Sequence, residues 1–118
     1  MDSKIKQALA TDKTIDITTI GRNTGKARRI EIWFHNVDGR FYITGRPGKR
    51  DWYQNMMAHP EFTFHLKESV IADLAATARP ITDEGERQAW FERYLAGSDR
   101  DVVAWIAESP LVEVTFVE

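Results

Sequence analysis

The chain has no cysteine among its 118 residues. It therefore has no disulfide framework, no thiolate nucleophile and no cysteine-ligated metal site. It also lacks an apolar run near the roughly 18 residues that a membrane-spanning helix needs. Its first residues, MDSKIKQALATDK, are polar and mildly amphipathic and do not follow the pattern of a signal peptide. These absences predict a cytoplasmic protein without an integral membrane segment.

The length and the apolar content bound the size of the core. At 118 residues we expect one domain, spanning residues 1–118. Hydrophobic residues make up 42% of the chain, which is enough for a modest core. Because small domains bury a limited fraction of their surface, a homodimer in which a second copy completes the core is compatible with this composition.

Positive charge is concentrated in one part of the chain. The net charge is −2, yet residues 21–55 hold eight of the 16 Lys and Arg residues against three acids. Most of these cations fall on glycine-containing turns between strand-like runs, where backbone N–H groups are free and a ligand can approach closely. The block therefore predicts a site for phosphate or carboxylate groups. Nucleic acid is disfavoured as a partner, because the net negative charge opposes polyanion binding beyond this patch.

Alternation of apolar and polar residues predicts a protein made mainly of strands. In the strand over 14–20, Ile15 and Ile17 share one face. In the next, over 28–36, Ile30 and Ile32 do so. Asp38-Gly39 is a hairpin signal, so we expect the first three strands to pair in succession. Further strands are expected over 41–44, 62–66, 70–78 and 111–117.

Three helices are expected among these strands. One spans 51–58, with Asp51 as its capping carboxylate. The others span 82–95, ending before Gly97, and 98–107, capped by Ser98. Many short strands with few helices indicate an α+β, mainly β protein, in which a mostly antiparallel barrel carries attached helices.

Two arginines follow the turn GRNTGKA, which has neither the P-loop spacing nor the dinucleotide-binding glycine pattern. Arg28 and Arg29 fall on opposite faces of the second strand, so one of them should point inward. Because arginine is rarely buried without an anion, we expect it to hold a ligand anion or to pair internally, for example with Glu31.

A second cationic group precedes the 51–58 helix, whose N-terminus attracts anions. It comprises Arg46, Lys49 and Arg50. This loop is either a second anion cradle or only a solvated connection, and Asp51 at the helix start would repel a phosphate placed there.

Aromatic residues lie near the basic groups in the sequence. Planes such as Trp33, Tyr42, Trp52 and Tyr53 suit a flat anionic ligand, although core packing is the more common role for the last two. The three histidines show no metal-ligand spacing, so no metal site is expected.

Three blocks together resemble the deazaflavin-dependent nitroreductase and quinone reductase family. They are TTIGRNTGKARRIEIWF, DGRFYITG and DWYQNMMAHPEF, and the resemblance extends from about Ile17 to Val117. It implies a split β-barrel, like that of small FMN-binding proteins. Family members commonly carry proline where this chain has Glu31, and we expect that carboxylate to pair with Arg29 or Arg28.

The resemblance also implies a coenzyme and the residues that bind it. The coenzyme is a reduced 8-hydroxy-5-deazaflavin (factor 420), which has a flat tricycle, a ribityl phosphate and a polyglutamate tail. Carried over by motif, the turn and the second strand would line the coenzyme, the next loop would follow the tricycle, and the helix would complete the phosphate and tail region. The implied binding residues are Arg22, Asn23, Thr24, Arg28, Arg29, Ile30, Ile32, Trp33, Thr44, Gly45, Arg46, Pro47, Lys49, Arg50, Trp52, Tyr53 and Asn55.

The implied function is an oxidoreductase that transfers hydride to a small electron-poor acceptor of the quinone, nitroaromatic or enone type. Trp33, Tyr42, Tyr94 and Trp105 are candidates for the acceptor pocket. The coenzyme carries the chemistry, so no catalytic side chain is assigned; a proton could come from His35, a tyrosine or solvent. The alternative is a split barrel that binds FMN or haem, with or without catalysis.

Overall fold

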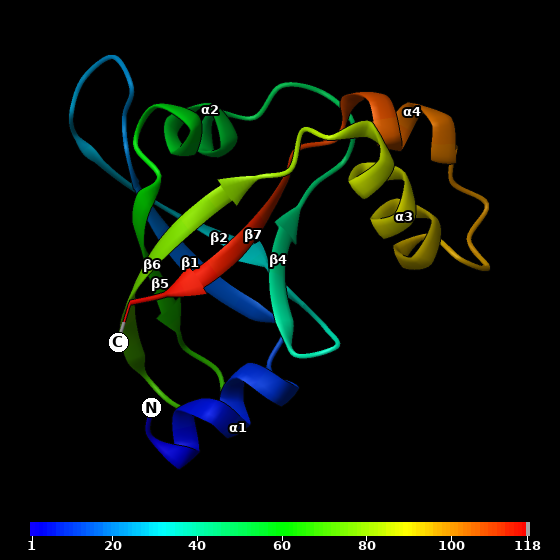
Figure 1. Cartoon of the computed structure of the whole chain (residues 1–118). Coiled ribbons are helices and arrows are strands. Elements are labelled where there is room, and N and C mark those ends of the chain that lie inside the picture. The colour runs from blue at the N-terminus through cyan, green and yellow to red at the C-terminus, as the bar shows by residue number, and fades with distance from the viewer. Residues whose placement is uncertain (118) are drawn as a thin grey trace.

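The computed structural model describes residues 1–117, and their strands form one antiparallel sheet that curls into a half-barrel (Figure 1). The order across the sheet is β2-β1-β5-β6-β7-β4-β3. The strands are β1 Thr14–Ile20, β2 Ala27–Trp33, β3 His35–Val37, β4 Arg40–Thr44, β5 Glu61–Leu66, β6 Ala72–Pro80 and β7 Leu111–Phe116. The expectation of a mainly β, antiparallel protein with attached helices is confirmed.

Helices cover the two ends of the sheet and one side (Figure 1). They are α1 Ser3–Thr11, α2 Asp51–Ala58, α3 Glu84–Tyr94 and α4 Val102–Glu108. The first of these was not expected from its mainly polar sequence. It forms because Asp2 accepts a hydrogen bond from the Lys4 N–H at 2.7 Å, and because Ala8 and Leu9 are buried against the sheet.

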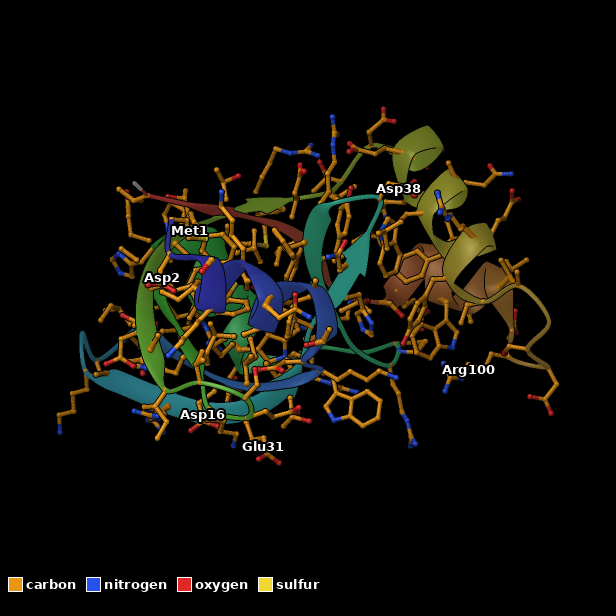
Figure 2. All side chains as sticks on the ribbon, turned by 90° about the horizontal axis from the view of Figure 1, so that it is seen from below. Met1, Asp2, Asp16, Glu31, Asp38 and Arg100 are labelled. Carbon is orange, nitrogen blue, oxygen red and sulfur yellow. The ribbon has the colours of Figure 1, made fainter. Side chains whose placement is uncertain are left out.

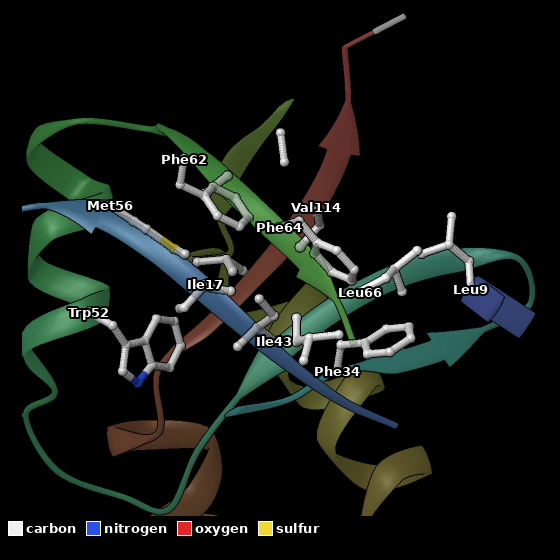
Figure 3. Packing of buried hydrophobic residues seen from close by; sticks show 14 of the residues in the cluster. Leu9, Ile17, Phe34, Ile43, Trp52, Met56, Phe62, Phe64, Leu66 and Val114 are labelled. Carbon is white, nitrogen blue, oxygen red and sulfur yellow. The ribbon is translucent and has the colours of Figure 1, made fainter. Parts of the chain in front are cut away.

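The main core fills the concave side of the sheet (Figure 3). The expected face of β1 is confirmed, since Ile15 and Ile17 are fully buried. From α2, Trp52 and Met56 insert their side chains into the same core. Burial of this apolar stripe fixes α2 at the end of the barrel.

A second apolar cluster holds α3 and α4 against β4. Trp90 stacks on Tyr94 with 4.9 Å between ring centroids, and Tyr42 and Trp105 are buried beside them. Tyr42, Tyr94 and Trp105 are three of the aromatics expected in an acceptor pocket. The structure uses them to join the helical pair to the sheet.

The two expected pairings of the first three strands are confirmed, but the run 28–36 is two strands and not one. The run 28–36 breaks at Phe34, whose buried side chain enters the core and whose N–H donates to the Lys13 carbonyl at 3.0 Å. Before the break β2 pairs with β1, and after it β3 pairs with β4. These halves lie at opposite edges of the sheet order. Alternation indicates which face a residue takes, but it does not show where one alternating run is divided between two strands.

Two expected helix caps are also wrong. Asp51 is the first helical residue of α2 and not its cap. The N-cap is Arg50, which makes no side-chain capping bond. In α4 the cap is Asp101, whose carboxylate accepts from the Ala104 N–H at 3.1 Å. Ser98 instead accepts from Arg100 in the preceding turn. The N–H groups at the start of α2 are therefore not occupied by a side chain.

Candidate functional site

A cavity of about 350 Å³, here called the turn cavity, lies between the loop after β1, the strand β2 and the start of α2. It brings together seven of the expected site residues from three separate parts of the sequence: Arg22, Asn23, Thr24, Arg28, Ile30, Trp52 and Asn55. Thr19, Gly21 and Asp51 also line it and were not expected.

The loop that forms one wall is an ordered turn. The Gly21 N–H donates to the Lys26 carbonyl and the Gly25 N–H to the Gly21 carbonyl, both at 2.8 Å. Gly25 has φ +70°, a left-handed conformation that glycine adopts without strain. A Cβ on Gly21 would lie 2.5 Å from the Thr24 hydroxyl, so the close turn requires a glycine there as well.

Asn55 fastens this turn to α2. Its side chain is 5% exposed, and its Oδ1 accepts from the Arg22 backbone N–H at 3.1 Å and from Arg22 Nη1 at 3.0 Å. Its Nδ2 donates to the Thr19 hydroxyl at 3.2 Å. One amide therefore satisfies three groups and sets the position of the Arg22 guanidinium.

The two neighbouring arginines of β2 have different surroundings. Arg29 lies on the outer face and donates to Asp16 at 2.9 Å, so it has an internal partner, although not the expected Glu31. Glu31 pairs with Lys67, which corrects the expected pairing with either arginine. Asp16 and Glu31 are opposite each other on β1 and β2 and lie together at one edge of the molecule (Figure 2).

Arg28 is on the other face of the strand and lines the turn cavity. Within residues 1–117 its guanidinium forms no ion pair. Arg22 Nη2 is 3.3 Å from Asp51 Oδ1, but the Asp51 side chain is 92% exposed. Such a solvated pair is weak and exchangeable. The cavity thus offers two guanidinium groups and the uncapped start of α2 to an anion, against one solvent-facing carboxylate.

The second cavity, here called the helix cavity, measures about 470 Å³ and lies on the opposite side of α2. It contains two of the expected site residues, Lys49 and Tyr53. The lining is completed by residues of the 45–50 loop, α2, the segment before α3, α3, the end of α4 and the segment after it: Gly48, Gln54, Thr82, Arg87, Ala107, Glu108, Ser109 and Pro110.

The amino-acid sequence matches the family described as F420H(2)-dependent quinone reductase over residues 1–108. The chain belongs to this family. Membership confirms the resemblance given by the three sequence blocks. It also agrees with a reduced deazaflavin, here coenzyme F420, as the cofactor of the family.

Solved structures with low sequence identity share the fold. A candidate pyridoxamine 5'-phosphate oxidase from Listeria innocua has a TM-score of 0.73 at 10% identity, covering 98% of this chain and 92% of its own. An FAD-binding protein from Mesorhizobium loti has a TM-score of 0.67 at 11% identity, with coverages of 100% and 91%. An F420-H2 dependent reductase has a TM-score of 0.56 at 20% identity, with coverages of 88% and 95%. The split β-barrel expected from the resemblance is confirmed.

The remaining family-implied residues line neither cavity. Thr44 is buried and donates to the Pro110 carbonyl at 2.6 Å, while Ile32 packs against the main core. Trp33 is 59% exposed on the outer side of β2. Arg29, Gly45, Arg46, Pro47 and Arg50 also lie outside both linings, and Arg50 Nη1 donates to the Lys49 carbonyl at 3.0 Å.

Three further features of the described residues bear on the candidate site. No group of three or more His, Asp or Glu side chains within residues 1–117 is arranged to hold a metal ion. In the same part of the chain no helix is long and apolar enough to cross a membrane. His35 lies 4.8 Å from Tyr94, ring to ring, and burial lowers its pKa, so its neutral form is favoured.

Proposed function

We propose that this chain binds reduced coenzyme F420 at the turn cavity and passes its hydride to an electron-poor acceptor of the quinone, nitroaromatic or enone type. Family membership supports the coenzyme. The observation that carries the placement is Arg28, an arginine without an internal anion on the wall of a cavity that an uncapped helix also faces. When bound, the coenzyme supplies the hydride chemistry.

The anionic part of the coenzyme fits the cationic end of the cavity. Arg28 is free for two parallel hydrogen bonds to a phosphate. Arg22 is held in place by Asn55, and its one ion pair among the described residues is with the exposed Asp51, so a phosphate can replace that carboxylate as its partner. The first N–H groups of α2 complete the set of donors.

The flat part of the coenzyme fits the apolar wall of the same cavity. Ile30, 40% exposed, follows Arg28 on the inward face of β2, and Trp52 faces it from α2. In this arrangement the apolar side chains exclude water from one face of the tricycle, while the arginines fix its position relative to an acceptor.

Solvent is the proton source in this proposal. His35 belongs to the aromatic cluster of α3 and β4, lines neither cavity, and has a pKa lowered by burial. Tyr42 is buried in the same cluster. We therefore assign no side chain of the chain to proton transfer, and the residues act by binding and orientation.

Titration of the purified protein with F420 tests the placement. Arg28→Ala should raise the dissociation constant about 10- to 100-fold, which is the loss expected for a hydrogen bond to a charged group. Arg40→Ala removes the same charge at the exposed start of β4 and should leave the affinity unchanged. Equal affinities for the parent and Arg28→Ala would refute the site, and tighter binding of FMN than of F420 would favour the flavin alternative.

A homodimer is also proposed, through β2. This strand pairs only with β1 among the described residues and is exposed along most of its length, including Trp33 at 59%. An exposed edge strand with apolar side chains is a common site of association. Light scattering at increasing concentration should show a dimer for the parent chain and a monomer for Trp33→Glu. A monomeric parent would contradict this part of the proposal.

A further inference from the structure

The helix cavity contains a buried cation that no carboxylate neutralises. Arg87 on α3 is 8% exposed, and within residues 1–117 it forms no ion pair. Its Nε donates to the Ile106 carbonyl and its Nη1 to the Ile81 carbonyl, each at 2.8 Å, and its Nη2 donates to the Ser109 carbonyl at 2.5 Å. The carbonyl groups satisfy these three N–H donors, but they do not neutralise the positive charge of the side chain.

A second polar group in the same lining lacks a partner. Ser109 is 3% exposed, and its hydroxyl makes no hydrogen bond to any described residue. A buried hydroxyl without a partner is unfavourable and uncommon in folded proteins. It therefore points to a group that is supplied from outside the chain.

Four other residues of the lining have side chains that can donate hydrogen bonds. Lys49 contributes an exposed cation, and the side chains of Tyr53, Gln54 and Thr82 make no hydrogen bond within residues 1–117. Glu108 is the one carboxylate of the lining. Two cations and one anion leave a single positive charge, which suits one carboxylate group, with its single negative charge, better than a doubly charged phosphate group.

We propose that the helix cavity is a second ligand site, which binds the carboxylate group of a small molecule between Arg87, Ser109 and the rim donors. It is separated from the turn cavity by α2, whose residues 53 and 54 face one side while 51, 52 and 55 face the other. The carboxylate belongs either to a free metabolite or to the glutamate tail of a coenzyme held on the other side of the helix.

Amide chemical shifts of the free protein, titrated with glutarate, test this site directly. Glutarate should shift the resonances of residues 48–49, 53–54, 82 and 107–109 and leave those of 21–28 in place. Glutaramide has the same shape without the charge and should bind at least tenfold more weakly. Equal shifts with glutaramide, or tighter binding of inorganic phosphate than of glutarate, would overturn the carboxylate assignment.

Ser109→Ala tests whether the Ser109 hydroxyl binds a ligand or has only a structural role. Loss of a hydrogen bond to a charged acceptor should raise the glutarate dissociation constant about tenfold. The melting temperature should stay the same or rise, because an unpaired buried hydroxyl is removed. Ser98→Ala, in the exposed turn before α4, should leave the glutarate dissociation constant unchanged. Unchanged glutarate affinity in Ser109→Ala would refute the role of this residue and the site built on it.

Saturation with F420 then identifies the source of the carboxylate. If glutarate still shifts the residues of the helix cavity, the site serves a separate small molecule. If F420 displaces glutarate, the tail of the coenzyme reaches the cavity. Since the titration of free protein needs no coenzyme, a failure of the proposed reductase function would not affect its outcome.

Discussion

Arg28 and Arg87 lie on opposite sides of α2 and carry the same charge into different surroundings. Arg28 projects from an exposed strand into the turn cavity without an internal partner, whereas Arg87 is buried and donates to three backbone carbonyls. The first arrangement leaves the strong bidentate geometry of a guanidinium to a ligand. The second uses most of that geometry to join α3 to the segments around α4. The same residue type is thus available to an external anion on one side of α2 and joins elements of the fold on the other.

The largest effect is expected from Arg87→Met. Three carbonyls near the end of α4 would lose their donor, and buried unsatisfied groups cost about 1–3 kcal/mol each. We expect a loss of at least about 3 kcal/mol in the free energy of unfolding. Arg28→Met should change it by less than about 0.5 kcal/mol. Urea denaturation of both variants measures these free energies. Similar losses in Arg87→Met and Arg28→Met would contradict the difference between the two arginines.

Asn55→Ala should remove the hydrogen bonds that join α2 to the wall of the turn cavity and should leave the helix cavity unchanged. The substitution removes the acceptor of two Arg22 N–H groups and the donor to Thr19. We expect about 2 kcal/mol of destabilisation together with weaker coenzyme binding. Gln54→Ala is the neighbouring control, because Gln54 lines the helix cavity and its side chain makes no hydrogen bond among the described residues. The comparison of α2's two sides fails if Gln54→Ala weakens coenzyme binding as much as Asn55→Ala.

Gly25→Ala and Gly97→Ala form a matched pair for backbone strain. Both glycines have positive φ, +70° and +77°, and a Cβ at either position meets no heavy atom within 4 Å. Each substitution should therefore cost about 1 kcal/mol, from conformation alone. Thermal unfolding measures that shared loss. Only Gly25→Ala, in the turn that holds Arg22, should also weaken F420 binding, and a parallel loss in Gly97→Ala would show that the effect is not local.

The smallest effect concerns acid stability and should be independent of both cavities. Hydrogen bonds from Lys67 and then Arg29 lower the pKa of Asp16. Because the folded pKa lies below the unfolded value of about 3.9, the stabilisation is complete above that pH and is lost as the pH falls through the folded pKa. Asp16→Asn should flatten the acid limb of stability measured between about pH 2 and 5.

Asp99→Asn is the control for this effect, since Asp99 is exposed and has no ion pair within residues 1–117. It should leave the acid limb as steep as that of the parent. The slope should also be the same with and without F420, because Asp16 lies on the outer face of the sheet. A coenzyme-dependent slope would connect the outer face to the turn cavity and contradict the separation described above.

The sequence predicted individual elements well where one face is buried. The strand over 14–20 agrees with β1 and the helix over 51–58 with α2, because regular burial leaves a clear apolar period. The division of the run 28–36 into two strands was not predictable in the same way. The bend at Phe34 looks like any apolar position of an alternating strand, and only the partners of β2 and β3 reveal it.

In the candidate site, too, some residues could be predicted from the sequence and others could not. Motifs brought Arg22, Arg28 and Asn55 together in advance, since they occur in two family blocks. The position of Arg87 could not be read from the charged sequence EGERQAWFERY, in which it resembles a solvated helical residue. Its burial depends on carbonyls near residues 81, 106 and 109, and these approach only when α3 and α4 pack together.

The position of β7 has a consequence for how the chain folds. Leu111–Phe116 lies between β6 and β4 and pairs with both. Without it, no strand pairing joins the part of the sheet that contains β1 to the part that contains β3 and β4. Synthesis proceeds from the N-terminus, so the sheet cannot be completed until residues 111–116 have left the ribosome. Closure of these distant contacts should therefore be the slow step of folding.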